Sequence, residues 1–222
     1  MTFRKILTAF VLVSASIVTT LSPTHAEIGV EGSKQLAGLL GGFESFSADF
    51  DQVSAGSESR KMEQAHGSLV MAKPNRFNWI AKEPFPQQLI SDGEFLWIYD
   101  PDLEQATRKK LDLQQNGVPA LILNGQIDEL QESYSIRLIH ETADSQLFEL
   151  LPFDEQSMFT RIRLLFNTGL ITELQLEDSL GQRTSILFKN QQLNPQLNNN
   201  AFSFTPPDGI DVIIEDSMEL TN

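Results

Sequence analysis

The sequence predicts a mainly antiparallel β protein with a few helices (α+β class), and three observations support this. Apolar and polar side chains alternate in many short segments, which is the period of a strand with one buried face. Turn residues separate these segments at near-regular intervals. Two other segments carry apolar residues at helical spacing or nearly all round. Short strands with regular turns are typical of an antiparallel sandwich or barrel.

The first 26 residues have the pattern of a cleaved secretory signal. Arg4 and Lys5 precede an apolar run, Pro23 breaks that run, and a small-x-small cleavage site ends at Ala26. A membrane-anchoring helix is the alternative, but several Ser and Thr residues make the run only weakly apolar. Removing 26 of the 222 residues leaves 196, which is one domain's worth, so we expect a single domain over residues 27–222.

The charge of the chain excludes some classes of partner. The full chain has a formal net charge of −14, and removal of the signal's two basic residues gives −16. Such acidity repels phosphate backbones and anionic lipid surfaces, so we expect no nucleic-acid partner. The chain has no cysteine, so we expect neither disulfides nor a lipid anchor on an N-terminal cysteine. After cleavage we expect a freely soluble exported protein.

Taken in order, the first element after the signal is a short amphipathic helix. Leu36, Leu39 and Leu40 have helical spacing within residues 31–40, and Gly41-Gly42 is a stop signal. A second helical region is expected later in the chain, where residues 120–123 are apolar nearly all round and more apolar residues follow at helical spacing. Helices with this much apolar surface must lie against something apolar.

The strands follow the period of two. The stretch from Gly67 to Pro101 has the most strand and turn signals, since it holds both Trp residues of the chain and the hairpin-turn dipeptide Asp92-Gly93 between its last two strands. Other strands are expected around residues 46–50, 134–138, 147–151, 162–166, 170–176 and 185–188, with a final pair of strand signals in 201–214.

Several of these strands are apolar on both faces, which a sheet closed over its own core does not need. Two explanations stay open at this point. Helices can simply cover one face of the sheet, as in a two-layer domain, or sheet and helices can enclose a cavity for an apolar ligand. Composition does not separate the two, although 15 Phe against 2 Tyr favour a dry interior slightly.

Several motifs in order resemble the LolA family of periplasmic outer-membrane lipoprotein carriers. They are Gly67-x-Leu69, Lys73-Pro74-Asn75, Phe77-Asn78-Trp79, Ser91-Asp92-Gly93, Leu96-Trp97-x-Tyr99-x-Pro101, Glu104-Gln105-Ala106 and Phe202-x-Phe204-x-Pro206-Pro207. The resemblance implies an unclosed β-barrel covered by a short helical lid that encloses an apolar cavity. It also implies a monomeric periplasmic chaperone that takes triacylated lipoproteins from an inner-membrane ABC transporter and passes them to an outer-membrane receptor.

The resemblance assigns Lys73 as the lid latch. The family typically has an arginine at this position, which bonds to the lid and holds the closed state, whereas this chain has lysine. Because an ammonium lacks the planar fork of a guanidinium, we expect the lid to be held less rigidly. Arg76 is close in sequence, but its offset along a strand places it on the opposite face, so we do not expect it to replace the latch.

The remaining site residues are candidates to line the acyl-chain cavity. Phe77 matches a family position at the cavity mouth, and Trp79 lies two residues further along the same strand. Aromatic residues on a sheet are more often plain core than ligand wall. The other candidates are Phe95, Trp97 and Tyr99 on the neighbouring hairpin and Leu36, Leu39, Leu40, Leu121, Ile122 and Leu123 on the lid.

An enzyme is poorly supported by the sequence. Beyond the signal there are only His66 and His140, no thiol, no Gly-x-Ser-x-Gly elbow and no phosphate-binding loop of the Walker type. We therefore expect no catalytic activity, metal or cofactor. The alternative to a carrier is a non-carrier binding module of the same fold, either a sensor or the outer-membrane receptor, but that receptor would need a lipidated N-terminal cysteine.

Overall fold

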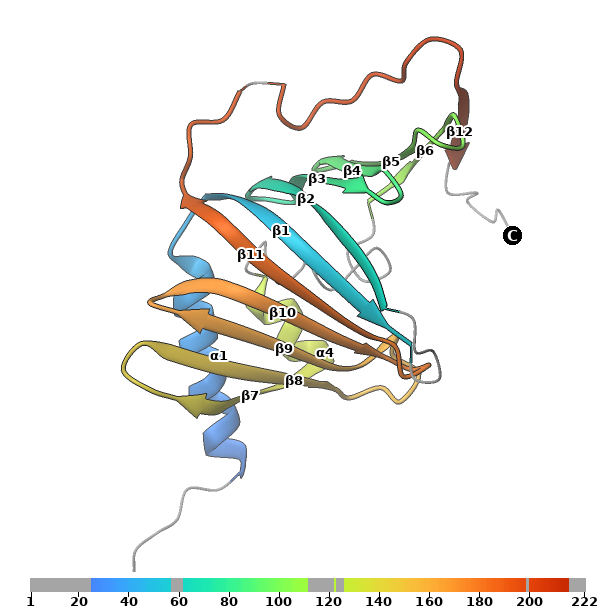
Figure 1. Ribbon diagram of the computed structural model, residues 1–222. Helices are drawn as coiled ribbons and strands as arrows, with labels where there is room; N and C mark the ends of the chain where they lie inside the picture. Colours follow the sequence, from blue (N-terminus) through green and yellow to red (C-terminus); the bar gives the residue numbers. More distant parts are fainter. Residues whose placement is uncertain (1–24, 57–61, 112–121, 123–125, 199, 216–222) are drawn as a thin grey trace, which may run out of the picture.

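A computed structural model describes residues 25–56, 62–111, 122, 126–198 and 200–215 (Figure 1). This part of the chain forms one twelve-stranded sheet in the order β12-β6-β5-β4-β3-β2-β1-β11-β10-β9-β8-β7, with two helices. All neighbouring strands are antiparallel except β12 and β6, which are parallel. Since β7 and β12 are edge strands, the sheet is not closed. The elements are α1 (His25–Gly41), β1 (Ser45–Ala55), β2 (Met62–Ala72), β3 (Arg76–Glu83), β4 (Gln87–Asp92), β5 (Phe95–Asp100), β6 (Gln105–Lys110), α4 (Ile127–Ser133), β7 (Tyr134–Glu141), β8 (Ser145–Pro152), β9 (Phe159–Asn167), β10 (Leu170–Asp178), β11 (Arg183–Leu193) and β12 (Asp211–Glu215).

The sheet has an inner face, which α1 and α4 cover, and an outer face (Figure 1). Inner-face side chains of β1, β2, β3, β5, β7, β8, β9, β10 and β11 form one core cluster with α1 and α4. Helix α1 lies close to the backbone of β7, because a Cβ added to Gly32 would be only 2.9 Å from the backbone nitrogen of Leu138. Among the described helices, none is both long and apolar enough to cross a bilayer.

The predicted fold class is confirmed: the strands are mostly antiparallel, the sheet is unclosed and helices cover one face. Helix α1 begins at His25, before the expected start at residue 31. The parallel pairing of β12 with β6 was not predicted. Most of the helical region expected around residues 120–123 lies outside the described residues, but Ile122 is described and is fully buried in the core cluster.

Gly67 permits a close approach between β2 and its neighbours. A Cβ at this position would lie 1.9 Å from the carbonyl oxygen of Ile80 and 2.6 Å from the ring of Phe50. The Phe50 ring crosses over the glycine and stacks on Trp79, with ring centroids 4.0 Å apart. The missing side chain at Gly67 therefore lets β1 and β3 share an aromatic pair across β2.

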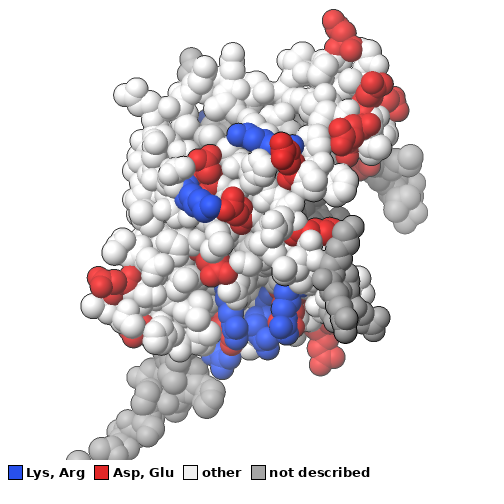
Figure 2. Space-filling view, viewed as in Figure 1, with Lys and Arg blue, Asp and Glu red and all other residues white. Residues whose placement is uncertain are grey.

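The outer face of β7, β8 and β9 carries an arginine cluster in an otherwise acidic protein, and Figure 2 shows basic side chains gathered at the lower end of this face. At its centre is the carboxylate of Glu149, which is 6% exposed. It accepts hydrogen bonds from Arg137 Nη2 at 2.6 Å and Arg163 Nη2 at 2.9 Å, and Arg161 Nε lies at 3.4 Å. Burial alone would raise the pKa of Glu149, but the hydrogen bonds from Arg163 and Arg137 outweigh it and lower the pKa.

We predict that Gly67→Ala lowers the free energy of unfolding by about 1–3 kcal/mol, because the Ile80 carbonyl is backbone and cannot move aside cheaply. Gly38→Ala is the matched control, since its Cβ would meet nothing within 4 Å and alanine favours the helix. Urea unfolding at equilibrium measures both variants. Equal midpoints for Gly67→Ala and the unmodified protein would contradict the close approach.

We predict that Glu149→Gln destabilises the protein by about 1–2 kcal/mol at neutral pH, with the partly exposed arginines limiting the effect. Because the folded-state pKa of Glu149 is lowered, its contribution is complete above the usual glutamate pKa of about 4.3 and is lost as pH falls through the folded value. The difference between variant and unmodified protein should therefore narrow below about pH 4. Urea midpoints at several pH values test this, with the exposed Glu155→Gln as control; a difference that widens on acidification would refute it.

Candidate functional site

Lys73 joins the sheet to the C-terminal end of α1. It directly follows β2, and its Nζ donates hydrogen bonds to the carbonyl oxygens of Leu40 at 2.7 Å and Phe43 at 2.6 Å. Carbonyls at the end of a helix have no partner inside the helix, and the negative end of the helix dipole favours a cation there. The Nζ also lies 4.5 Å from the centroid of the Phe43 ring. One side chain thus fastens the end of α1 and the residues after it.

The surroundings of Lys73 are partly apolar. Burial lowers the pKa of Lys73, and the nearby carboxylate of Glu44 opposes this effect. The backbone reinforces the contact, since the Lys73 N–H donates to the Glu44 carbonyl oxygen at 2.9 Å. The ammonium is therefore held close to α1 by both its side chain and its main chain.

Beneath α1, the inner face of the sheet is apolar. Leu36 and Leu40 on the helix are fully buried, Leu39 is partly buried, and Phe77 on β3 is 9% exposed. Trp79 packs against the same core cluster. The structure thus brings these predicted residues together with Ile122, whereas Leu121 and Leu123 lie outside the described residues.

The structure corrects the placement of Phe95, Trp97 and Tyr99, which were expected to line the same cavity as Phe77. Strand pairing places Trp79 opposite Leu89 and Leu89 opposite Ile98, so Ile98 shares the inner face with Trp79. The three aromatics alternate with it and point to the outer face. Both sets of side chains in β5 are apolar, so alternation alone does not reveal which set faces the core.

Sequence reasoning missed the residues of β5 that do face inwards. Leu96 belongs to the core cluster and is 1% exposed, and Ile98 packs against that cluster. The available signal was register: Leu96 pairs with Ser91, which pairs with Phe77. Counting pairs outward from the Asp92-Gly93 turn places Leu96 on the same face as Ser91, and the register of β4 with β3 puts Phe77 on that face too.

The outer aromatics are covered by residues 194–198 and 200–210, which run from β11 to β12 and which we call the strap (Figure 1). The ring of Phe204 in the strap lies 5.3 Å from that of Trp97 and 5.4 Å from that of Tyr99, measured between centroids. The guanidinium of Arg108 lies 3.8 Å from the centroid of the Phe95 ring. These aromatics therefore have structural partners on the outer face.

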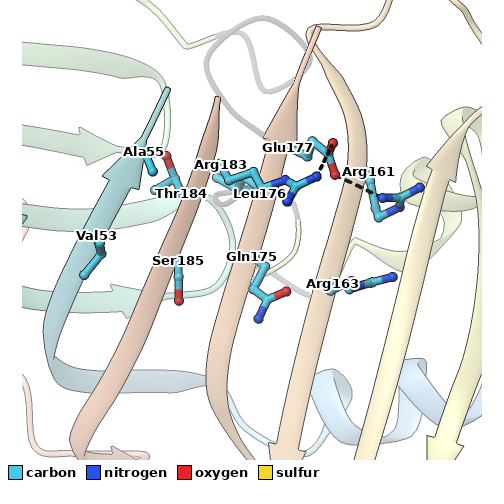
Figure 3. A pocket seen from close by; sticks show the side chains of 10 residues that line it. All are labelled: Val53, Ala55, Arg161, Arg163, Gln175, Leu176, Glu177, Arg183, Thr184 and Ser185. Atoms are coloured by element: carbon cyan, nitrogen blue, oxygen red, sulfur yellow. Dashed lines mark hydrogen bonds and ion pairs between the residues drawn. The ribbon is translucent and has the colours of Figure 1, made fainter. Parts of the chain in front are cut away.

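Two hollows lie on opposite faces of the sheet. One of about 400 Å³ lies on the outer face over β1, β9, β10 and β11, where Glu177 pairs with Arg161 and Arg183 (Figure 3). Its lining combines these charged side chains with Val53, Ala55 and Leu176. The other, of about 240 Å³, lies on the inner face beyond Trp79 at the β3–β4 turn. Ala81 and Phe85 border it together with polar and charged side chains, which include those of Gln52, Glu63 and Asp100. It adjoins the apolar core at the end of the sheet away from Lys73.

The site consists mainly of apolar contacts between α1 and the sheet. In the described ranges, no three or more His, Asp or Glu side chains are grouped so that they could hold a metal ion. The helix–sheet interface is built from aliphatic and aromatic side chains. An apolar ligand that enters this interface must displace α1 or the side chains that α1 buries.

Comparison with known proteins gives consistent relatives over nearly the whole chain. A protein from Chromohalobacter salexigens, described as outer-membrane lipoprotein carrier protein, is 36% identical over 197 residues that cover 89% of this chain and 93% of the relative. A protein of the same description from Pseudomonas paraeruginosa is 36% identical over 212 residues, covering 96% and 100%.

A solved structure of an uncharacterized conserved protein from Thermus thermophilus covers 86% of this chain and 100% of its own, with a TM-score of 0.52. At 9% identity this likeness shows the fold alone. The family model described as outer membrane lipoprotein carrier protein LolA matches residues 41–205, which is more than half of the chain. The chain therefore belongs to the LolA family of outer membrane lipoprotein carrier proteins.

Proposed function

We propose that the protein is a periplasmic carrier that shields the acyl chains of lipoproteins between α1 and the inner face of the sheet. The observation that carries this proposal is the apolar interface under α1, fastened at one end by Lys73. Relatives that are 36% identical bear the description of lipoprotein carriers, which supports a carrier over a sensor or other non-carrier module. The cargo would be triacylated lipoproteins, taken from an inner-membrane ABC transporter and passed to an outer-membrane receptor.

The energetics of acyl burial favour a cover that resists opening. Burial is worth about 0.8 kcal/mol per CH₂ group, so complete sequestration of several chains would make release too slow. In the closed structure, Leu36 and Leu40 already fill the space against the sheet. Cargo must displace these contacts and the Lys73 bonds, and the free energy of opening is subtracted from the affinity. The lid thus keeps binding reversible.

The hollow beyond Trp79 is the proposed entry for acyl chains. It lies on the inner face at the open end of β1, β2 and β3, and Trp79 stacks on Phe50, which belongs to the core cluster. Chains that enter there would meet the aromatic pair first and Phe77 next along β3. Movement of α1 about its fastened end would then admit the chains between helix and sheet.

The remaining features of the proposal follow from the carrier role. Residues 1–26 would be a signal that directs export, and residues 27–222 would act as one domain and as a monomer. We propose no enzymatic step and no cofactor, so the energy for loading would come from the transporter.

The carrier role predicts a soluble one-to-one complex. Purified protein is incubated with membranes that carry labelled lipoproteins and the exporting transporter, and the soluble fraction is analysed by size exclusion. Phe77→Asp should reduce the complex by about tenfold or more, because a buried carboxylate opposes an apolar ligand. Phe153→Asp is the control, since Phe153 is 64% exposed. Absence of any soluble complex would remove the carrier proposal, and equal loading of the two variants would remove Phe77 from the site.

The lid proposal predicts that Lys73→Leu loads cargo more tightly and releases it to the receptor about tenfold more slowly. Loss of two charge-assisted hydrogen bonds makes opening easier, and about 1.4 kcal/mol corresponds to a factor of ten. Lys73→Arg, unlike Lys73→Leu, should keep release at the rate of the unmodified protein, because its guanidinium can donate to several carbonyls. Transfer to receptor-bearing membranes is the measurement and Lys82→Leu, at an exposed position, is the control. Unchanged release by Lys73→Leu would refute the latch.

A further inference from the structure

The strap begins at the segment that joins α1 to β1. The side-chain oxygen of Asn194 accepts hydrogen bonds from the backbone N–H groups of Glu44 at 2.8 Å and Ser45 at 3.2 Å. The backbone N–H of Asn194 donates to the carbonyl oxygen of Ser45 at 2.8 Å. The same segment contains Phe43, whose carbonyl accepts one of the two Lys73 bonds. Asn194 therefore fixes the residues about which α1 would have to swing.

Further along, the strap supports the Lys73 backbone from the outer face. Phe202 is only 8% exposed, although it belongs to the segment that connects β11 to β12. The Arg76 guanidinium lies 5.3 Å from the centroid of its ring. Arg76 Nη2 donates to the carbonyl oxygen of Lys73 at 3.2 Å. Arg76 thus connects a ring of the strap to the main chain of the residue that fastens α1.

Additional contacts keep this part of the strap in place. Asn78 Nδ2 donates to the carbonyl oxygen of Ala201 at 2.9 Å, and Gln88 Nε2 donates to Asn78 Oδ1 at 3.0 Å. Phe204 is held against Trp97 and Tyr99. The strap is consequently fixed across β3, β4 and β5 on the face opposite α1.

We propose that the strap controls the lid, with Asn194, Phe202 and Arg76 acting as positioning residues for the Lys73 latch. This inference rests on the proposed role of α1 as a lid. A docked strap and a closed lid stabilise each other. By linkage, undocking of the strap favours opening of the lid, and opening of the lid favours undocking of the strap. The strap therefore gives the outer face of the sheet an influence on access to the inner face.

The test uses a thiol probe in the full protein. Since the chain has no cysteine, Ala37→Cys, at a partly buried position of α1 against the core, provides a single thiol whose native-state labelling rate reports lid opening. In this background, Phe202→Ala, Asn194→Ala and Arg76→Gln should each raise the labelling rate about 5- to 20-fold. Phe153→Ala, which removes an exposed ring elsewhere, should not change it. Urea midpoints monitor global stability, and Arg76→Gln leaves the strap aromatics intact should Phe202→Ala fold poorly.

A double-mutant cycle separates control of the latch from general loosening. If the strap acts through Lys73, then Phe202→Ala should add less than about twofold to the labelling rate in a Lys73→Leu background. The reciprocal effect is that Lys73→Leu increases hydrogen exchange at the Asn194, Ala201 and Ser203 amides, which are bonded in the closed structure.

The outcomes distinguish the two proposals. A rise in labelling with Lys73→Leu but not with the three strap variants would overturn the strap inference and leave the lid intact. Fully multiplicative effects of Phe202→Ala and Lys73→Leu would also overturn it. No rise with Lys73→Leu itself would count against the lid and, with it, against the strap's control.

Discussion

The bonds from the Lys73 ammonium to the carbonyl oxygens of Leu40, in the last turn of α1, and of Phe43, just after the helix, are the contact on which the proposed mechanism depends. They join the helix to the sheet through a single side chain, at the helix end where backbone carbonyls lack partners within the helix. Most of the remaining helix–sheet contact is apolar and non-directional, so contacts with an apolar ligand could replace it. A directional contact at one end and non-directional contacts along its length would suit the proposed lid, because a displaced helix would have one position to return to.

The positions of most strands could be predicted from the sequence, but the side-chain orientation of β5 could not. Alternation located most strands and Asp92-Gly93 located a turn, because these signals are local. Trp97 and Tyr99 were assigned to the wrong face because β5 is apolar on both sides and its outer side is covered by the strap, more than a hundred residues away. The parallel pairing of β12 escaped prediction for the same reason. Lys73 was identified through family resemblance alone, since its helix partner at Leu40 is distant in sequence.

The two faces of the sheet differ in their side chains and in the contacts that these make. The inner face concentrates apolar side chains around Phe50, Phe77 and Trp79, and the missing side chain of Gly67 permits the close stacking of Phe50 on Trp79. The outer face carries the arginine cluster around Glu149 and the aromatic contacts of the strap. The ladder hydrogen bonds join strands to one another and do not involve α1, so displacement of α1 would not itself break them.

The position of α1 beside β7 also bears on self-association of the protein. An edge strand presents unpaired backbone groups that can pair with another chain, and α1 lies close to the backbone of this one. Movement of the helix away from β7 would uncover an edge as well as an apolar face. Self-association would then grow with concentration and with dwell time in that state. If α1 opens as proposed, rapid reclosure would therefore limit self-association, whatever its effect on delivery.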